Sequence, residues 1–271
     1  MKKLSESNAL IVGLARDCEE GVRSTLPRLD DFKKTFKNVH FRIISNDSID
    51  NTEAVLDTWA ENRVDVKIIK QNNLHIHAPK RTARLAVCRN ICLDELKHLS
   101  NKMNIDYFIM MDLDGLNSEL IKNSDLTKVI ESAPKGWGGL FANQRGNYYD
   151  IWALRHKIWC PNDCFAEAKK YRQNIINIIK HGGIKKTDKK AFKKYIIDRQ
   201  IIIPPTDEPI KVNSAFGGFG IYKTSYLKGA TYLGLTSNGR EVVEHVNVNK
   251  QVEKNGGDLY ILPNLLNDPH W

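Results

Sequence analysis

The sequence contains no long apolar segment, and cysteine, proline and glycine are sparse. Apolar runs such as residues 9–15 are only seven residues long, whereas a membrane-spanning helix needs about 20 apolar residues. We therefore expect no transmembrane segment and a cytoplasmic protein. The 17 glycines and 9 prolines follow no period, which excludes a collagen-like chain. The 5 cysteines are an odd number at low density, which indicates reduced thiols and excludes a disulfide scaffold.

What the sequence does contain is typical of a folded protein. Hydrophobic residues make up 41% and charged residues 27% of the 271 residues, and 9 Phe, 5 Trp and 9 Tyr can give a core its shape. No Pro- or Ser-rich linker divides the chain. We therefore predict one domain over residues 1–271.

Positive charge is concentrated in one segment. The chain carries 41 Lys and Arg against 32 Asp and Glu, a formal charge of +9, and residues 165–199 alone hold eleven Lys or Arg against three Asp or Glu. We expect a solvated helical insertion here, with two short amphipathic helices around Gly182-Gly183. A basic face can also bind the phosphate groups of a lipid, a nucleic acid or a nucleotide, so peripheral contact with an anionic surface is the second interpretation.

Strand-like and helix-like segments alternate through the first half of the chain. Stacked β-α units of this kind build a mainly parallel sheet with helices on both sides. We therefore predict an α/β fold with a Rossmann-type mixed sheet flanked by helices, in which residues 1–115 form a nucleotide-binding half. The expected strands are residues 8–15, 40–46, 64–70 and 106–114, with 138–143, 148–155, 213–223 and 258–264 in the second half, and the expected helices are residues 18–36, 52–61 and 82–99.

The most informative motif is a pair of carboxylates after a buried strand. The sequence "YFIMMDLDG" places Asp112, Leu113 and Asp114 directly after five apolar residues and before Gly115. Two carboxylates at positions i and i+2 can share one hard divalent cation, and ligands of open α/β sheets bind at the carboxyl ends of strands. The motif therefore predicts a site for a metal and a nucleotide, although a plain Asp-rich turn has the same pattern. No dinucleotide fingerprint or Walker motif is present.

Two further segments carry candidate nucleotide ligands. Asp47, in "ISNDSIDNTEAVL", can accept a hydrogen bond from a nucleobase or ribose, while Asn51 or Thr52 caps the next helix. Arg81 and Arg84 begin the helix that precedes the carboxylate pair, where guanidinium groups and the helix amino terminus both favour a pyrophosphate. The alternative is that both are ordinary surface arginines.

Taken in order, several segments resemble a known enzyme family. "IVGLARD", "SNDSIDNT", "RLAVCRNICLDEL", "FIMMDLDG", "YYDIWALR", "SAFGGFGIYK" and "VVEHVNVNKQVEKNGGDLYILP" are similar to glycosyltransferases of the GT-A fold. Within these, the chain most resembles the fungal capsule-associated α-1,3-mannosyltransferase type. The resemblance spans roughly residues 9–264, and the basic segment 165–199 has no counterpart in it.

The resemblance implies roles for individual residues. Asp112 and Asp114 would hold Mn²⁺ or Mg²⁺ against the diphosphate of a GDP- or UDP-sugar, and His245 would complete the metal shell. Glu244 and Asp150 would be the catalytic carboxylates. The remaining contacts implied for the donor are Ala15, Arg16 and Leu113, together with Gly217 and Gly218, whose lack of a Cβ lets the backbone approach the donor; Asp150 and Arg155 would line the sugar or acceptor site.

The function implied is a metal-dependent glycosyltransferase that moves a sugar such as mannose from a nucleotide-sugar donor to a glycan or another hydroxyl acceptor. Residues 116–271 would then form the acceptor half. Two alternatives stay open. A sugar-phosphate nucleotidyltransferase has the same architecture, but it normally carries a glycine-rich basic loop where this chain has "GLARDCEEG". A basic nucleic-acid-binding protein would use the lysines of residues 165–199, and it leaves the interior carboxylates unexplained.

Overall fold

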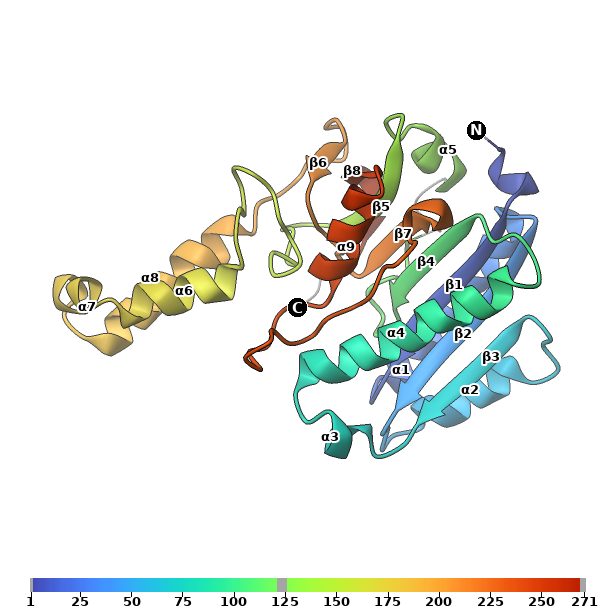
Figure 1. Cartoon of the computed structure of the whole chain (residues 1–271), viewed down its shortest axis with the longest axis horizontal. Helices are drawn as coiled ribbons and strands as arrows, with labels where there is room; N and C mark the ends of the chain where they lie inside the picture. Colours follow the sequence, from blue (N-terminus) through green and yellow to red (C-terminus); the bar gives the residue numbers. More distant parts are fainter. Residues whose placement is uncertain (1, 121–125, 269–271) are drawn as a thin grey trace.

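The computed structural model describes residues 2–120 and 126–268. Within them, eight strands form one sheet in the order β3-β2-β1-β4-β7-β5-β8-β6 (Figure 1). The strands are β1 (Asn8–Ala15), β2 (Asn38–Asn46), β3 (Val66–Gln71), β4 (Tyr107–Asp112), β5 (Trp137–Gln144), β6 (Ile210–Val212), β7 (Phe219–Lys223) and β8 (Asp258–Asn267). Strands β3, β2, β1 and β4 run parallel, and β7 lies antiparallel between β4 and β5. The predicted mixed α/β sheet is confirmed, and both halves of the chain contribute to it.

Helices cover both faces of the sheet, which explains why the interiors of β1 and β4 are continuous apolar runs. Leu10 and Val12 of β1 belong to one apolar cluster with residues of α4 and α9, whereas Ala9 and Ile11 belong to a second cluster with α1, α2 and α5. The helices of this layer structure are α1 (Glu19–Asp31), α2 (Thr52–Ala60), α4 (Arg81–Ser100), α5 (Leu126–Glu131) and α9 (His245–Lys254), with the short α3 (Leu74–His77) before α4.

The basic segment forms three helices where the sequence predicts two. They are α6 (Cys164–Gln173), α7 (Ile175–His181) and α8 (Ile184–Tyr195), and they extend away from the sheet with α7 at the far end (Figure 1). Asn174 separates α6 from α7 because its side-chain oxygen accepts hydrogen bonds from the backbone N–H groups of Ile176 and Asn177. Gly182, at φ 70°, ends α7 in a left-handed conformation.

Two expected strands in the second half are wrong or too long. Residues 148–155 are irregular, with a single bridge between Arg155 and Ser214. The buried positions here, 148, 151, 153 and 154, do not alternate as they would in a half-buried strand. Strand β7 begins only at Phe219, because Gly217 and Gly218 have positive φ values of 63° and 78° that no strand adopts. The expected helix 18–36 is α1 followed by a 3₁₀ turn at Phe32–Lys34.

Helices long and apolar enough to cross a bilayer do not occur in the described part of the chain.

We predict that Gly218 is essential for the turn that precedes β7. A Cβ at this position would lie 2.0 Å from Cδ2 of Leu116, whereas one at Gly239, which also has a positive φ of 76°, would meet nothing within 4 Å. Gly239→Ala should lower the free energy of unfolding only by backbone strain, about 1 to 2 kcal/mol. Gly218→Ala should lower it by about 2 to 5 kcal/mol, because overpacking adds to the strain. Urea unfolding of both variants measures the difference, and equal losses would contradict the packing argument.

Candidate active site

A cavity of about 290 Å³ lies at the carboxyl end of β4. Six parts of the chain meet there: α4, the turn after β4, the irregular segment around residue 150, the loop before β7, the start of α9 and the base of the helices α6 and α8. The Arg, Asp, Glu and His residues that line the cavity are Arg81, Arg89, Asp112, Asp114, Asp150, Glu244 and His245. The structure therefore brings together six of the predicted site residues, together with Arg89, which the sequence analysis did not select.

Arg89 of α4 is the cation at the centre of this cavity. Its side chain is 4% exposed, its Nε donates to Oε1 of Glu244 at 2.9 Å, and one terminal nitrogen lies 3.4 Å from Oδ1 of Asp112. The guanidinium also lies over the ring of Phe216, 4.9 Å from its centroid. Burial opposes the charge, but the carboxylates of Glu244 and Asp112 raise the pKa of Arg89 above its ordinary value. Arg89 is therefore a permanent positive charge between two carboxylates.

The turn that carries Asp112 and Asp114 is held by buried amide groups. The side-chain nitrogen of Asn117 donates to the backbone oxygens of Asp112 at 2.9 Å and Gly218 at 2.8 Å. Asn267, at the end of β8, donates to Oδ1 of Asn117 at 3.1 Å. The turn also packs tightly against α1, because a Cβ at Gly21 would lie 2.3 Å from the backbone of Asp114. The carboxylate pair is therefore mounted on a rigid support.

Negative charge accumulates around Asp112. Its side chain is mostly buried, with 28% exposed. This burial raises the pKa of Asp112 to about 7, because it disfavours the ionised form. Arg89 lowers this pKa, and the carboxylates of Asp114, Asp150 and Glu244 raise it further. One buried guanidinium therefore does not balance the carboxylates of the cavity.

Asp150 is positioned by two backbone N–H groups. Its Oδ2 accepts from Gly217 at 2.9 Å, and its Oδ1 accepts from Ala153 at 3.3 Å. Burial raises the pKa of Asp150 to about 6, although these two hydrogen bonds lower it in part. A carboxyl group with this pKa can take up or release a proton near neutral pH.

His245, the first residue of α9, is buried with neither ring nitrogen hydrogen-bonded. Its ring stacks on Phe216 at 3.8 Å and meets Tyr232 edge-on at 5.5 Å. Burial, and then the charge of Arg89, lower the pKa of His245 well below its ordinary value. The imidazole is therefore neutral at pH 7, as a metal ligand must be. Within residues 2–120 and 126–268, no three His, Cys, Asp or Glu side chains are grouped so as to hold a metal ion by themselves.

Other predicted donor ligands lie apart from this cavity. Asp47 accepts hydrogen bonds from the backbone of His75 at 3.0 Å, and its Oδ2 lies 3.2 Å from Nδ1 of the same residue. Burial raises the pKa of Asp47, but these contacts outweigh it and lower the pKa below its ordinary value. Arg84 donates to the backbone oxygens of Ala78 and Pro79 and so closes the loop before α4. Of the two arginines, only Arg81 lines the cavity.

The remaining predicted contacts serve the protein's own packing. Leu113 is fully buried and would contact a Cβ at Gly13, so its side chain does not face the cavity. A Cβ at Gly217 would lie 2.6 Å from Nε2 of Gln144, so the space that the missing Cβ leaves is filled by protein. Arg155 donates to the backbone oxygens of Trp152 and Leu154 and lines a different cavity.

Ala15 ends β1, and the guanidinium of Arg16 beside it pairs with Asp17 at 3.3 Å. Asp17 accepts in turn from the backbone of Ile49 at 2.8 Å, which ties the loop after β1 to the loop after β2. Asn51, one of the two predicted caps, occupies the N-cap position of α2, but its side chain makes no capping hydrogen bond. Asp50 supplies that bond instead, because its Oδ1 accepts from the backbone N–H of Thr52 at 3.0 Å.

Arg89 could have been found from the sequence. It follows Leu85 by four residues and precedes Cys92, Leu93 and Leu96, so it occupies a position on the apolar face of α4. A charged residue on a buried helix face requires a partner of opposite charge. That partner is Glu244, 155 residues later in the sequence.

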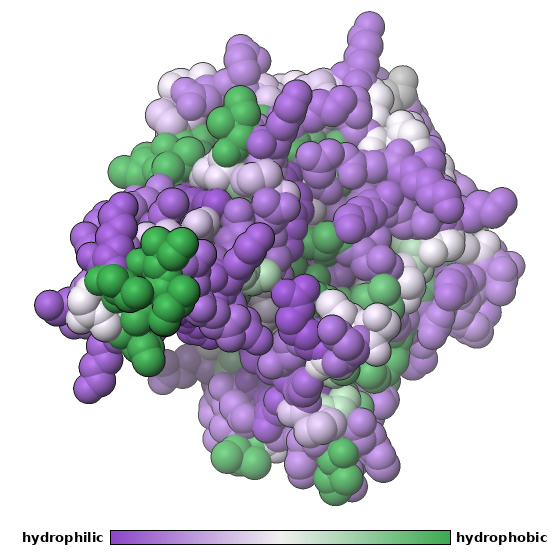
Figure 2. Space-filling view, turned by 60° about the vertical axis from the view of Figure 1, so that its left-hand side comes forward, coloured by the Kyte–Doolittle hydropathy of each residue, from purple (hydrophilic) through white to green (hydrophobic). Residues whose placement is uncertain are grey.

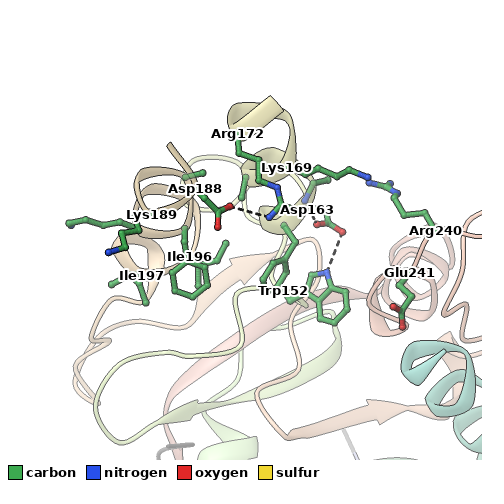
Figure 3. A pocket seen from close by; sticks show the side chains of 16 residues that line it. Trp152, Asp163, Lys169, Arg172, Asp188, Lys189, Ile196, Ile197, Arg240 and Glu241 are labelled. Carbon is green, nitrogen blue, oxygen red and sulfur yellow. Dashed lines mark hydrogen bonds and ion pairs between the residues drawn. The ribbon is translucent and has the colours of Figure 1, made fainter. Parts of the chain in front are cut away.

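A second, larger cavity of about 590 Å³ adjoins the first at the base of α6 and α8. Figure 3 shows its polar side, where Arg172 pairs with Asp188 at 3.2 Å and Nε1 of Trp152 donates to Asp163 at 3.3 Å. Trp152, Phe165 and Ile196 line both cavities. The basic segment is therefore built into the wall of the candidate active site.

Comparisons with known proteins give structural matches only, since neither a protein-family model nor a curated protein matches the chain. Mannosyltransferase PcManGT from Pyrobaculum calidifontis, in complex with GDP-Man and Mn²⁺, matches with a TM-score of 0.48 and 9% identity over 97% of this chain and 57% of that one. S. aureus TarS 1–349, in complex with UDP-GlcNAc, matches with a TM-score of 0.47 and 13% identity over 98% of this chain and 59% of that one.

Glucosyl-3-phosphoglycerate synthase from Mycobacterium tuberculosis, in complex with Mn²⁺, UDP and phosphoglyceric acid, has a TM-score of 0.43 and 8% identity over 96% of this chain and 69% of that one. The chain spans less than two thirds of the length of PcManGT and of TarS 1–349. With TM-scores below 0.5, these likenesses establish neither a family nor an activity for this chain.

We predict that the charge of Arg89 makes a large contribution to the free energy of unfolding. Arg89→Met should lower the free energy of unfolding by about 3 to 5 kcal/mol, because it leaves the buried carboxylate of Glu244 unpaired. The double variant Arg89→Met/Glu244→Leu should recover most of this loss, since no buried charge of the pair then remains. Denaturant unfolding measures both. A double variant no more stable than Arg89→Met would show that the loss comes from packing around Phe216 and not from charge.

Proposed function

We propose that this chain is a metal-dependent glycosyltransferase, which transfers a sugar from a GDP- or UDP-linked donor to a hydroxyl group of a glycan or another acceptor. The observation that carries the proposal is the convergence of Asp112, Asp114, Asp150 and Glu244 on one cavity at the carboxyl edge of the sheet. Ligands of open α/β sheets bind at this edge. We further propose that the chain is one domain, with residues 1–115 binding the nucleotide and 116–271 binding the acceptor.

The residues present fit a divalent cation such as Mn²⁺ or Mg²⁺. Asp112 and Asp114 offer hard oxygen ligands. Burial, and to a smaller extent the neighbouring carboxylates, raise the pKa of Asp112, and a bound cation would favour its ionised form. Mg²⁺ commonly binds one or two carboxylates together with substrate phosphates, so two protein carboxylates suffice. His245 lines the same cavity with a neutral imidazole whose two nitrogens lack hydrogen-bond partners, but among the described residues it is not grouped with the two carboxylates around one metal position. When bound, the cation would neutralise the diphosphate leaving group.

The other cavity residues have separate tasks in this proposal. Arg81, exposed on the first turn of α4, can bind a donor phosphate at the amino-terminal end of this helix. Arg89 is engaged by Glu244 through Nε and by Asp112 through one terminal nitrogen, so we assign it the task of holding these two carboxylates in place.

A base must accept the proton of the acceptor hydroxyl, and Asp150 is the better candidate. Its carboxyl group has a pKa of about 6 and is fixed by backbone N–H groups alone. The carboxylate of Glu244 is already engaged by Arg89. We therefore assign Asp150 as the base and Glu244 as a residue that positions Arg89.

Thermal unfolding with a panel of UDP-, GDP- and CMP-sugars tests the proposal. One of the nucleotide sugars should raise the midpoint only when Mn²⁺ is present, because a ligand that binds the folded state alone stabilises it. Asp114→Asn should abolish this rise. It should keep the fold, because Asp114 is exposed and the amide oxygen of asparagine can still accept from the backbone of Leu116. Asp207→Asn, another exposed carboxylate outside the cavity, is the matched control. A rise of equal size in EDTA would refute the metal role, and no rise with any donor would refute the proposed donor class.

Two carboxamide variants separate the roles of Asp150 and Glu244. Asp150→Asn should lower kcat by about 100-fold or more, the typical loss when a general base is removed. It should leave stability unchanged or higher, because the fold disfavours the ionised form of Asp150. Glu244→Gln should instead lower stability, because Arg89 loses its nearest counter-charge. Steady-state kinetics and urea unfolding measure these effects. A Glu244→Gln variant of normal stability and low kcat would assign the base to Glu244.

A further inference from the structure

Residues 164–199, which comprise α6, α7 and α8, form an arm that extends away from the sheet (Figure 1). Helices α6 and α8 pack along each other, and α7 lies across their far end. An ion pair within the arm, between Arg199 and Glu167 at 2.6 Å, closes its base. Trp159 of the body anchors this base, because its Nε1 donates to the backbone oxygen of Arg199. The arm is thus a projecting element with a fixed root.

The end of the arm exposes a cluster of large apolar side chains, which we call the tip. The tip consists of Ile175, Ile176, Ile179 and Ile184, and these side chains are 65 to 74% exposed. Helix α7 contributes no buried residue to the fold. Figure 2, in which this end of the molecule is turned toward the viewer, shows an apolar cluster surrounded by hydrophilic side chains. Contiguous exposed apolar groups of this kind mark a surface that binds a partner or a membrane.

Hydrogen bonds hold α7, which carries most of the tip, against α6 and α8. The hydroxyl of Tyr171 lies 2.8 Å from Nε2 of His181, which joins α6 to the end of α7. Thr187 of α8 donates to the backbone oxygens of Gly183 at 2.9 Å and Asn177 at 3.3 Å. These contacts fix α7 against α6 and α8 through its polar side. The isoleucines therefore point outward as a consequence of the fold.

Positive charge is distributed along the arm and is not balanced within it. Each of the three carboxylates of the arm pairs with a cation of the arm: Asp188 with Arg172, Asp198 with Lys193, and Glu167 with Arg199. Eight of the eleven cations remain without a carboxylate from the arm. All eight are exposed lysines, at positions 169, 170, 180, 185, 186, 189, 190 and 194.

We propose that the arm docks on an anionic membrane surface, with the tip inserted among the lipid headgroups and the lysines in contact with lipid phosphates. Surface-bound helices combine exposed apolar side chains with lysines in this way. The tip explains why a membrane is favoured over a nucleic acid: phosphate backbones attract lysines, but they offer no apolar region that would bury four isoleucines. The proposal rests on the arm alone and does not require the proposed enzymatic function.

Co-sedimentation of the full chain with vesicles tests the proposal. The protein should bind phosphatidylcholine vesicles that contain phosphatidylglycerol at least about tenfold more tightly than vesicles without it, because each basic residue near an anionic surface strengthens binding about fivefold. Raising the salt concentration above about 0.1 M should weaken this binding, since it screens the lysines. Equal binding to both kinds of vesicle, or binding to neither, would overturn the proposal.

Substitution of the tip separates insertion from charge attraction. The triple variant Ile175→Ser/Ile176→Ser/Ile179→Ser should bind anionic vesicles at least about tenfold more weakly at the same salt concentration, because the inserted apolar area is lost. Its unfolding midpoint should match that of the unmodified chain, since the three side chains are exposed. Ile49→Ser/Val64→Ser removes exposed apolar groups from the body as a matched control and should bind normally. A tip variant that binds like the unmodified chain would contradict insertion.

Lysine substitutions complete the test. Lys185→Gln/Lys186→Gln/Lys189→Gln should weaken vesicle binding at least about tenfold, whereas Lys37→Gln/Lys102→Gln/Lys135→Gln, on exposed residues of the body, should not. Two other results would overturn the proposal. One is salt-sensitive retention of RNA or DNA by a chain that does not bind vesicles. The other is a dimer, detected by sedimentation velocity, that the tip variant abolishes, because the tip would then be an interface between two copies of the chain.

Discussion

The structure depends on one buried guanidinium. Arg89 extends from the apolar face of α4 to the end of β4 and the start of α9, where it meets Asp112 and Glu244. Each of these carboxylates would be unfavourable in its position without a counter-charge, and a buried arginine without partners would be equally unfavourable. The pair with Glu244 therefore specifies how α9, late in the sequence, sits against α4. It also keeps a cation next to the carboxylates from which the cavity is built.

The mixed direction of the sheet follows from the insertion of β7 between β4 and β5. Because β7 runs antiparallel to both, its start lies beside the end of β4, and Gly217 and Gly218 come next to Asp112. The backbone of Asp112 donates to the oxygen of Gly218 at 2.9 Å. The amides of Asn117 and Asn267 complete this connection with side-chain hydrogen bonds. The second half of the chain thus contributes structurally to the turn that holds the carboxylate pair.

The sequence predicted those parts that depend on local pattern. The apolar strands β1, β2 and β4 and the helix α4 lie within a few residues of their expected positions, because each has a clear periodicity and a clear end. The irregular segment 148–155 was mistaken for a strand because aromatic and apolar residues are common to strands and to buried loops. The carboxylate of Asp150 is held at the cavity by hydrogen bonds from backbone N–H groups, and no pattern of side chains in the sequence predicts such bonds. The isoleucines of α7 have the composition of a core face, and only the arrangement of the three helices leaves them exposed.

Three side chains, Trp152, Phe165 and Ile196, line both the candidate active site and the cavity at the base of the arm. Two sites with common walls are thermodynamically linked whenever a ligand at one of them shifts those walls. The linkage is reciprocal: the factor by which occupancy of one cavity changes affinity at the other is the same in both directions. The arm shares these residues with the candidate active site. A ligand that shifts them at the base of the arm would therefore change the free energy with which a second ligand binds beside the carboxylates.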